Sequence, residues 1–448
     1  MNLMKVYNRL PVWCQTLAVS LEGHRIQKRR YDTQFENQYQ DFMNRNDWSY
    51  EQKCAYRDEQ LQKIVKHCYE TVPYYRALFD SLKIDYRQIK CLEELKCIPI
   101  LDKQTIRDHF EEFFSSRYAR ENLIEQHTSG STGSGFSFYQ NREAHAAVWA
   151  HVWRGNHNIG LRRDMWCAYF GGRAIVPPER KTGPCWRINY PGRQIMFSIY
   201  HMTHQNFAQW LKVLNKYRPP WIQGYPSALL PFATYLEESG QRLSYIPKVI
   251  TLSSENVSFA QEDYIQRVFG VYPMQNYAQC EAVATFRQRL DRKVIVDEDF
   301  SAVEFIPVGS DGLCRIVGTT LSNYAMPFLR YDTKDLATFR LTQEGREILS
   351  LDGRDEDDIR LRDGGRVRRL SRVFQDQPRV IEAQLIQKSL DLVEFHVVKS
   401  PDFSQEEACR LEQAIRGYLT DRIAYKIVYV DRVRRNKNGK VRFIISEL

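Results

Sequence analysis

The sequence predicts an α/β protein, with a large N-terminal domain of layered sheets and helices and a small α+β domain at the C-terminus. Three observations predict this class. Roughly the first 100 residues show helical apolar spacing, residues 160–350 alternate short apolar runs with helical segments, and the tail from about 356 has its own strand–helix–strand pattern. A chain of 448 residues, 43% of them hydrophobic, can bury one large core and a second, smaller one.

The N-terminal part is predicted to be a helical lead-in to the large domain. In the segment E-Q-L-Q-K-I-V-K-H-C, the apolar residues Leu61, Ile64, Val65 and Cys68 recur at helical spacing. Such a stripe is typical of a core-facing helix. Pro73 is expected to end this helix, because proline cannot continue one.

The middle of the chain is predicted to form the main sheet. Its short apolar runs are M-W-C-A-Y-F, Q-I-M-F-S-I-Y, W-I-Q-G-Y, K-V-I-T-L-S and L-C-R-I-V. Helical segments separate several of them, for example residues 207–217. Strands that alternate with helices predict a sheet covered by helices on its faces.

The tail is predicted to fold as a module of its own, so we expect domains at 1–355 and 356–448. A strand-like run at 392–399 precedes a helix, and a second strand-like run follows at 425–430. Ser404 and Glu407 form a capping-box pattern at the start of the helix. We expect this small domain to be mobile on a hinge near its first residue.

Composition limits where the protein acts and what it binds. The ten cysteines form no C-x-x-C pair, and no apolar run reaches the roughly 18 residues needed to span a bilayer. These features predict a soluble, cytoplasmic protein, although Trp13, Leu17 and Leu21 on one helical face leave peripheral membrane binding as an alternative. The net charge of +9 favours a polyphosphate small molecule over nucleic acid, because no nucleic-acid module accompanies it.

One small-residue stretch, H-T-S-G-S-T-G-S-G-F-S-F at 127–138, is the strongest candidate for chemistry. Glycines let the backbone approach a ligand, and consecutive N–H groups in such a turn make an anion-binding concavity. The stretch lacks the G-K-[ST] ending of a P-loop. Taken alone it could equally be a flexible linker, so its interpretation depends on other motifs.

Four later motifs follow it in a fixed order: N-Y-A-Q-C-E at 276–281, R-Y-D-T-K-D-L at 330–336, L-D-G-R-D-E-D-D-I-R at 351–360 and R-N-K-N-G-K-V-R at 435–442. With these motifs the chain resembles the adenylate-forming superfamily from about residue 90 to its end. More narrowly, it is similar to the phenylacetate–CoA-ligase-like branch that includes capsular polysaccharide proteins of the CapK type. The T-S-G-S-T-G stretch is the most specific piece of this resemblance.

The resemblance implies a site residue by residue. The loop would hold the β- and γ-phosphates of ATP through Thr128, Ser129, Gly130, Ser131, Thr132 and Gly133. Tyr277 would stack on adenine, and Asp335 would accept the ribose hydroxyls. Glu281 would help hold Mg²⁺. Arg354 would reach ribose or phosphate, and Lys440 would be the mobile catalytic lysine, so that Lys440, Thr132 and Glu281 are the implied catalytic residues.

The sequence departs from the family pattern at several positions. Ala278 replaces a glycine, Cys280 replaces a hydroxyl residue, Lys334 stands where glycine is usual, and Glu356 stands where the hinge aspartate is usual. The basic residue that commonly follows the phosphate loop is also missing. None of these changes removes an implied catalytic charge, but they leave nucleotide affinity and substrate specificity open.

The predicted activity is activation of a carboxylic acid by ATP to an acyl-adenylate, with release of pyrophosphate, followed by acyl transfer to a thiol. Coenzyme A is the expected thiol, and the polysaccharide-linked branch suggests a sugar as the final acceptor. Transfer to an amine or hydroxyl, or a non-catalytic scaffold in polysaccharide assembly, are the alternatives. Aromatic residues predicted to line an acyl pocket, or to be core instead, are Phe170, Trp186, Tyr190, Trp221 and Tyr225. The acid, the acceptor and the oligomeric state are not set by the sequence.

Overall fold

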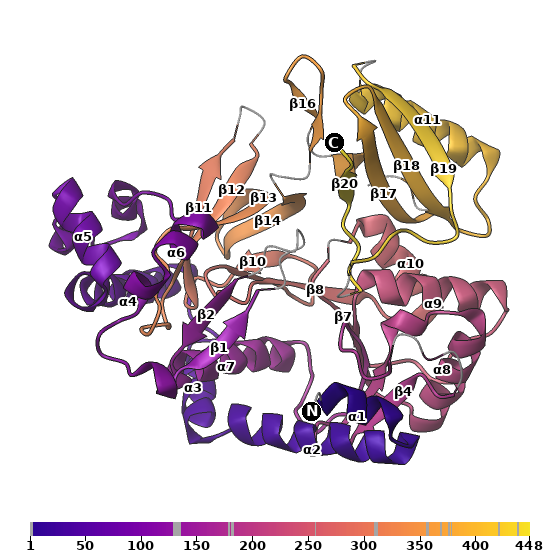
Figure 1. The fold of residues 1–448 in the computed structure, drawn as a ribbon, viewed down its shortest axis with the longest axis horizontal. Helices are drawn as coiled ribbons and strands as arrows, with labels where there is room; N and C mark the ends of the chain where they lie inside the picture. Colours follow the sequence, from indigo (N-terminus) through magenta and orange to yellow (C-terminus); the bar gives the residue numbers. More distant parts are fainter. Residues whose placement is uncertain are drawn as a thin grey trace. The chain divides into compact units, whose positions relative to one another are not determined.

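A computed structural model gives the fold of the chain (Figure 1). It describes residues 3–128, 136–177, 180, 183–255, 257–308, 312–354, 358–367, 370–374, 377, 379–419, 422–436 and 439–448. The chain forms two compact units. Unit 1 comprises residues 1–27, 161–275 and 356–448, and unit 2 comprises residues 28–160 and 276–355. No helix within the described residues is both long enough and apolar enough to cross a membrane.

The N-terminal 100 residues are helical, as predicted. They contain α1 (Leu3–Arg9), α2 (Val12–Arg30), α3 (Thr33–Asn44), α4 (Tyr50–Thr71) and α5 (Pro73–Leu82), with short 3-10 turns η1 (Tyr86–Gln88) and η2 (Leu92–Cys97). The predicted stripe Leu61, Ile64, Val65 and Cys68 lies on α4 and is fully buried. Helix α4 ends at Thr71, and Pro73 starts α5, where its missing N–H costs nothing.

Unit 2 continues with α6 (Lys103–Asp108), the 3-10 turns η3 (Phe110–Phe113) and η4 (Arg120–Asn122), and α7 (Arg142–Asn158). An antiparallel hairpin of β1 (Ile124–His127) and β2 (Ser137–Gln140) precedes α7. The small-residue stretch of the sequence connects these two strands.

An antiparallel sheet forms the rest of unit 2. Its strands are β9 (Thr285–Gln288), β10 (Val294–Val296), β11 (Ser301–Pro307), β12 (Cys314–Thr320), β13 (Tyr331–Thr342) and β14 (Gly345–Arg354). They lie in the order β11-β12-β13-β14-β10-β9, and β9 pairs with the second half of β8 (Pro273–Ala278). All these neighbours are antiparallel.

A mostly parallel sheet forms the centre of unit 1. It contains β3 (Cys167–Phe170), β4 (Trp186–Asn189), β5 (Gln194–Phe197), β6 (Trp221–Gly224), β7 (Val249–Leu252) and the first half of β8, in the order β8-β7-β6-β3-β5-β4. Only β4 runs antiparallel to its neighbour. Because four of the five runs read from the middle of the sequence form β3, β5, β6 and β7, and the fifth forms β12, the predicted α/β class is confirmed.

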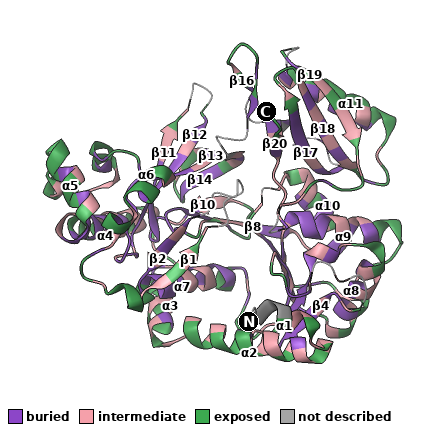
Figure 2. Ribbon diagram, in the orientation of Figure 1, coloured by how far each residue is buried: buried purple, intermediate pink, exposed green. Residues whose placement is uncertain are grey.

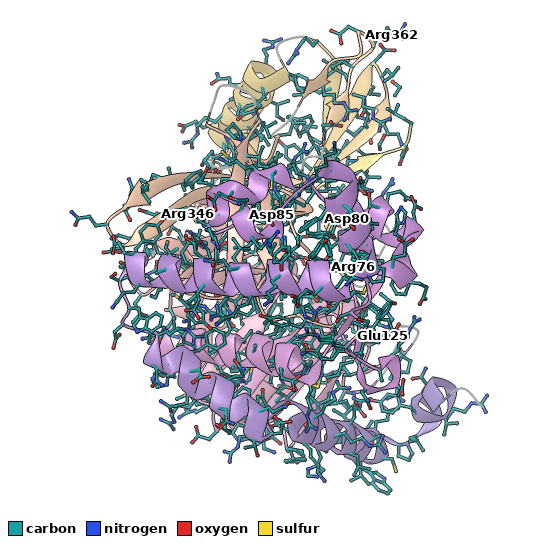
Figure 3. All side chains as sticks on the ribbon, turned by 90° about the vertical axis from the view of Figure 1, so that its left-hand side faces the viewer. Arg76, Asp80, Asp85, Glu125, Arg346 and Arg362 are labelled. Atoms are coloured by element: carbon teal, nitrogen blue, oxygen red, sulfur yellow. The ribbon has the colours of Figure 1, made fainter. Side chains whose placement is uncertain are left out.

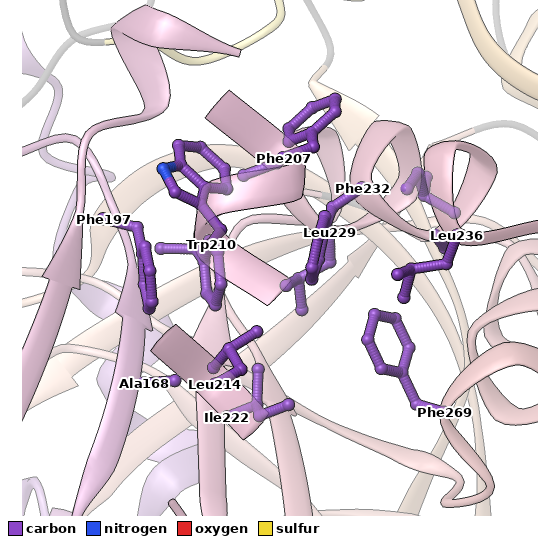
Figure 4. Packing of buried hydrophobic residues seen from close by; sticks show 14 of the residues in the cluster. Ala168, Phe197, Phe207, Trp210, Leu214, Ile222, Leu229, Phe232, Leu236 and Phe269 are labelled. Carbon is purple, nitrogen blue, oxygen red and sulfur yellow. The ribbon is translucent and has the colours of Figure 1, made fainter. Parts of the chain in front are cut away.

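Helices α8 (His204–Tyr217), α9 (Pro226–Glu238) and α10 (Phe259–Phe269) pack on this sheet, and the short η5 (Ile199–His201) leads into α8. Figure 4 shows the aromatic centre of the core, where Trp210 packs against Phe197 and Phe232. The ring centroid of Trp210 lies 5.4 Å from that of Phe197 and 6.1 Å from that of Phe232. This core fixes the strand ends from which the loops of unit 1 emerge.

The tail of the chain forms a four-stranded sheet with one helix across it. The strands are β17 (Val380–Ser389), β18 (Leu392–Lys399), β19 (Ala424–Tyr429) and β20 (Ile444–Ser446), in the order β19-β18-β17-β20, and the helix is α11 (Gln405–Leu419). A small ribbon of β15 (Ile359–Arg360) and β16 (Arg366–Val367) and the turn η6 (Leu370–Phe374) precede it. The predicted capping box is confirmed, since Ser404 and Glu407 exchange backbone and side-chain bonds at 2.8 and 3.3 Å.

Candidate functional site

The predicted nucleotide residues Tyr277 and Asp335 lie in direct contact in unit 2. Tyr277 is on β8 and Asp335 is on β13, and the Tyr277 hydroxyl donates a hydrogen bond of 2.8 Å to Asp335 Oδ2. Gln279 Nε2 donates to the same oxygen at 3.2 Å. Because β14, β10 and β9 lie between β13 and β8 in the sheet order, the sheet must curl to bring these two strands together.

A glycine on β12 allows this close approach. A Cβ atom added to Gly318 would lie 2.2 Å from the carbonyl oxygen of Val283, which is shorter than any tolerable contact. The segment that follows β8 therefore passes directly over the backbone of β12. Only glycine leaves that space. The curl of the sheet therefore depends on Gly318, which none of the sequence motifs includes.

The ring of Tyr277 is held on one side by Phe286. The two rings are stacked with centroids 4.6 Å apart and an interplanar angle of 14°. Burial, and then the negative charge of Asp335, raise the pKa of the Tyr277 hydroxyl well above its usual value. Tyr277 is therefore a neutral donor that orients Asp335 without cancelling its charge.

Glu281 is buried beside the same sheet, with 6% of its surface exposed. The hydroxyl of Tyr331, the first residue of β13, donates to Glu281 Oε1 at 2.9 Å. Oε2 accepts no hydrogen bond from a residue that the structure describes. Glu281 thus keeps one carboxylate oxygen available to a ligand while a neutral donor fixes the other.

The base of the small-residue loop is closed by Thr128. Its N–H donates to the Phe136 carbonyl at 3.0 Å, and the Phe136 N–H donates to Thr128 Oγ1 at 3.0 Å. The remaining predicted phosphate residues, Ser129, Gly130, Ser131, Thr132 and Gly133, lie outside the described residues. The backbone of Arg354 pairs with Asp335 across β13 and β14, and its side chain lies outside the described part of the chain.

The predicted lysine belongs to unit 1 and sits on a tight turn. The Lys440 N–H donates to Asn436 Oδ1 at 2.9 Å, and the Asn436 N–H donates to the Lys440 carbonyl at 2.9 Å. Gly439 has a φ of +77°, and a Cβ there would lie 2.5 Å from a methyl carbon of Ile199. The Lys440 Nζ lies 5.6 Å from the centre of the Tyr225 ring, so the ammonium faces an aromatic residue of the loop after β6.

Glu255, three residues after β7, connects this turn to the rest of unit 1. It accepts hydrogen bonds from the Ser227 N–H (3.0 Å), the Ser227 hydroxyl (2.8 Å) and the Val441 N–H (3.1 Å). Arg435 adds bonds to the Ser227 carbonyl (2.6 Å) and to Glu382 (2.7 Å). Burial raises the pKa of Glu382 to about 7, although Arg435 opposes the shift. The carboxylate of Glu255 therefore holds the backbone of Val441, the residue next to Lys440.

Known proteins are similar to this chain in sequence. Residues 361–447 match the CapK C-terminal domain family. Over 455 residues the chain is 22% identical to Protein CapK of Staphylococcus aureus, covering 99% of both chains. It is also 25% identical over 328 residues to phenylacetate–coenzyme A ligase of Aromatoleum evansii, covering 68% of this chain and 71% of the relative.

Among solved structures, 2-hydroxyisobutyryl-CoA ligase in the postadenylation state with 2-HIB-AMP superposes with a TM-score of 0.69 at 15% identity, covering 87% of this chain and 89% of the other. The fold of the chain is that of the adenylate-forming superfamily. Within it, the chain is similar to the CapK and phenylacetate–CoA ligase branch.

The adenylate-forming family implies a magnesium ion, and Glu281 fits that group. Magnesium usually takes one or two carboxylates and fills its other positions with water and substrate phosphates. Among the described residues no three or more His, Cys, Asp or Glu side chains gather as a complete metal site. A single buried carboxylate with one uncommitted oxygen is what a shared protein–phosphate site requires.

A second group of buried carboxylates in this adenylate-forming fold was not anticipated from the sequence. It follows β10, at Asp297, Glu298 and Asp299. Their partners come from distant helices and strands and are His151 and Arg287 on Asp297, Arg57 and Arg346 on Glu298, and Arg45 and Arg154 on Asp299. Arg346, on β14, is labelled in Figure 3. We call these nine residues the arginine cluster.

The aromatic residues proposed for the acyl pocket are either buried in the core or at least partly exposed. Phe170 is fully buried and stacked on Phe197 with centroids 4.5 Å apart, so it is core. Trp221 is also buried, and its Nε1 donates to Thr251 Oγ1 at 2.9 Å. Tyr190 is 57% exposed. Trp186 and Tyr225 remain, both partly buried and packed against the core of unit 1. Burial and the neighbouring Tyr169 raise the pKa of Tyr225 to about 12.

Proposed function

We propose that this protein is an ATP-dependent acid–thiol ligase. It activates a carboxylic acid as an acyl-adenylate and then transfers the acyl group to a thiol, for which coenzyme A is the proposed carrier. The observation that carries the proposal is the hydrogen bond between Tyr277 and Asp335, with Glu281 held by a second tyrosine on the same strand as Asp335. Two residues of one sequence motif, Tyr277 and Glu281, thus both bond to β13, which carries Asp335 from a second motif.

In the first step, a carboxylate oxygen of the acid forms a bond to the α-phosphorus of ATP, and the bond from that phosphorus to the bridging oxygen breaks to release pyrophosphate. Like charges oppose the attack. Asp335 accepts hydrogen bonds from the ribose hydroxyls and fixes the nucleotide, and Tyr277 offers its ring to the adenine. Magnesium held by Glu281 and the triphosphate would offset the phosphate charge.

Lys440 supplies the positive charge that stabilises the charge developing at the α-phosphate. In the second step the thiol sulfur attacks the acyl carbonyl carbon, the bond to the phosphate oxygen breaks, and AMP leaves. We propose that residues 356–448 form the mobile domain and 1–355 the large one, so that a hinge removes Lys440 between the two steps. The bonds of Glu255 and Arg435 then hold the lysine in place for the first step.

The ligands bound to one relative of the same fold support the thiol and the adenylate. The 2-hydroxyisobutyryl-CoA ligase structures are described as complexes with 2-HIB-AMP and CoA. The full-length similarity to CapK leads us to propose that the acyl group is destined for a sugar-containing acceptor in polysaccharide biosynthesis. Transfer to an amine or hydroxyl is the alternative within the same chemistry.

Exchange of labelled pyrophosphate into ATP, measured across a library of carboxylic acids, tests the first step without knowledge of the acceptor. Wild-type protein should support exchange with at least one acid, and Glu281→Gln and Lys440→Ala should each lose about a hundredfold. Lys426→Ala, on β19 of the same small domain, is the matched control and should keep full activity. Thioester formation on adding coenzyme A tests the second step.

Two outcomes would replace the proposal. Exchange in wild type with transfer only to an amine or hydroxyl would keep the adenylation and reject the thiol. Silence across the library, together with no heat of ATP binding in calorimetry, would favour a non-catalytic scaffold related to CapK.

A further inference from the structure

One face of α2 exposes an unusual row of large apolar side chains. Trp13, Leu17 and Leu21 are 70%, 54% and 60% exposed. Their spacing of four residues places them in successive turns on one side of the helix. Figure 2 shows exposed residues along this helix in green. We call these three residues the α2 stripe.

The opposite face of α2 is fixed against β4 and the turn that follows it, so the helix cannot rotate to bury the stripe. Gln15 is fully buried and its side-chain oxygen accepts a hydrogen bond of 2.9 Å from Arg187 Nε. A Cβ added to Gly23 would lie 1.9 Å from Asn189 Oδ1, so the backbone of α2 touches a side chain there. Ser20 donates to the Ile188 carbonyl at 3.2 Å. The stripe is therefore held outward by the packing of its own helix.

Basic side chains continue the same face toward the end of α2. At 100° per residue, His24 and Lys28 fall in line with the stripe, Arg25 falls about 40° beyond its edge, and Arg29 falls farther round the helix, close to Glu22. All four are exposed. The one acid of the helix, Glu22, lies off this line and sits 3.8 Å from Arg25. The face thus combines an apolar half with a positively charged half.

We propose that the face of α2 from Trp13 to Lys28 binds an anionic lipid surface, with the helix lying in the plane of the interface. Helices of this type insert tryptophan and leucine at the boundary between headgroups and acyl chains, while lysine and arginine meet the anionic headgroups. Tryptophan is especially suited to that depth, because its ring is apolar and its N–H is polar. The proposal does not depend on the adenylate chemistry proposed above.

Charge decides against a second copy of the chain as the occupant. A copy would bring an identical face, on which His24 and Lys28 lie in line with the apolar residues and no carboxylate does. Pairing two such faces would bury the apolar residues but bring like charges together. An anionic surface satisfies both halves of the face at once.

Other exposed apolar residues offer a matched control. Phe259 on α10, Leu290 after β9 and Leu341 on β13 are 67%, 72% and 67% exposed, similar to the α2 stripe, but they lie on three separate elements. Single exposed apolar residues are common on protein surfaces, whereas an aligned row beside a basic patch is not.

Co-sedimentation of the full chain with large vesicles tests the proposal. Vesicles of equal parts phosphatidylglycerol and phosphatidylcholine should bind the protein about tenfold more tightly than pure phosphatidylcholine, and binding should weaken as salt rises. The variant Trp13→Gln/Leu17→Gln/Leu21→Gln should lose about tenfold or more of this binding. Phe259→Gln/Leu290→Gln/Leu341→Gln should bind as wild type does, and thermal unfolding should confirm that both variants are folded.

A fluorescence measurement adds a readout at one residue. Subtracting the emission spectrum of Trp13→Phe from that of wild type isolates the fluorescence of Trp13. The maximum of this difference spectrum should move to shorter wavelength on adding anionic vesicles. Three results would overturn the proposal: equal binding by the stripe variant and wild type, equal binding to the two kinds of vesicle, or a dimer of wild type that the stripe variant converts to monomer without any vesicle binding. The last result would assign the face to a second copy.

Discussion

Unit 2 contains two groups of buried or half-buried carboxylates that are held in opposite ways. Glu281 and Asp335 accept hydrogen bonds from the hydroxyls of Tyr331 and Tyr277. The carboxylates of the arginine cluster, Asp297, Glu298 and Asp299, are instead surrounded by guanidinium groups, and Arg154 alone donates two bonds of 2.6 and 2.9 Å to Asp299. The difference teaches which buried acids a ligand can use. A carboxylate that accepts its hydrogen bond from a neutral tyrosine hydroxyl, as Glu281 does, keeps its negative charge for a cation, whereas the charges of Asp297, Glu298 and Asp299 are neutralised by guanidinium groups.

The titration behaviour of the two groups agrees with this contrast. Burial would raise the pKa of the Asp297 carboxyl, but His151, Arg287 and Arg154 overcome it and hold the pKa well below its usual range. Burial would also raise the pKa of the Asp299 carboxyl, but its partners lower it, and Arg154 contributes most to that lowering. The arginine cluster is therefore expected to govern stability, and the tyrosine-held acids are expected to govern catalysis.

The largest expected effect is on stability, from Arg154→Met. This change leaves Asp299 and Asp297 buried with fewer partners, and breaking a buried ion pair on one side costs about 3–5 kcal/mol. Chemical denaturation should show the loss directly. Arg340→Met is the matched control, since Arg340 makes the same two-pronged contact with Glu347 but its side chain is 59% exposed. That variant should lose no more than about 1 kcal/mol, and equal losses in the two variants would contradict the contrast.

The next effect is on activity, from Glu281→Gln. The amide oxygen can still accept the bond from Tyr331, so the free energy of unfolding should change by less than about 1 kcal/mol. Pyrophosphate exchange should fall about a hundredfold or more, because the charge that holds the magnesium is gone. A variant that unfolds, or one that keeps its exchange rate, would place Glu281 with the structural acids instead.

A smaller effect concerns pH. Burial lowers the pKa of His151 to about 4, below its value of about 6.5 in the unfolded chain. Between these values the unfolded chain binds a proton that the folded chain does not, so the free energy of unfolding should fall as pH falls, by up to about 1.4 kcal/mol per unit. His151→Gln should flatten the profile between about pH 6.5 and 4. The low pKa of Asp297 acts in the same direction but below this window, so an unchanged slope in the variant would refute the assignment to His151.

Much of the fold was predictable because local patterns and packing agree in it. The strand at 392–399 and the capping box of Ser404 lie where the sequence indicated. Pro73 lies at a helix boundary, as predicted, but it also begins the next helix, α5. The central strand β17 was missed. Its sequence, V-I-E-A-Q-L-I-Q-K-S, mixes apolar and polar residues without strict alternation, because Gln384 and Gln387 are buried and bond to the backbone of neighbouring segments.

The candidate site divides in the same way. Motif order pointed to Tyr277, Glu281 and Asp335, and the structure joins Tyr277 to Asp335 by a hydrogen bond. Contacts that depend on long-range folding were invisible. No sequence motif included the three carboxylates of V-D-E-D-F, and only the fold brings arginines to them from α4, α7, β9 and β14 and from the residue directly after α3. Likewise, nothing in the sequence links Glu255 to Val441.

The central claim is that the tyrosine-held carboxylates bind the nucleotide. The most direct test is the shift in unfolding temperature on adding magnesium and ATP, measured for wild type, Asp335→Asn and, as a control, Glu347→Gln, whose carboxylate is held by an arginine. The account predicts that magnesium and ATP raise the unfolding temperature of wild type and of the control. The rise should be smaller in Asp335→Asn, by the amount that corresponds to about a tenfold weaker affinity for ATP. An Asp335→Asn protein that is stabilised by ATP as strongly as wild type would contradict it.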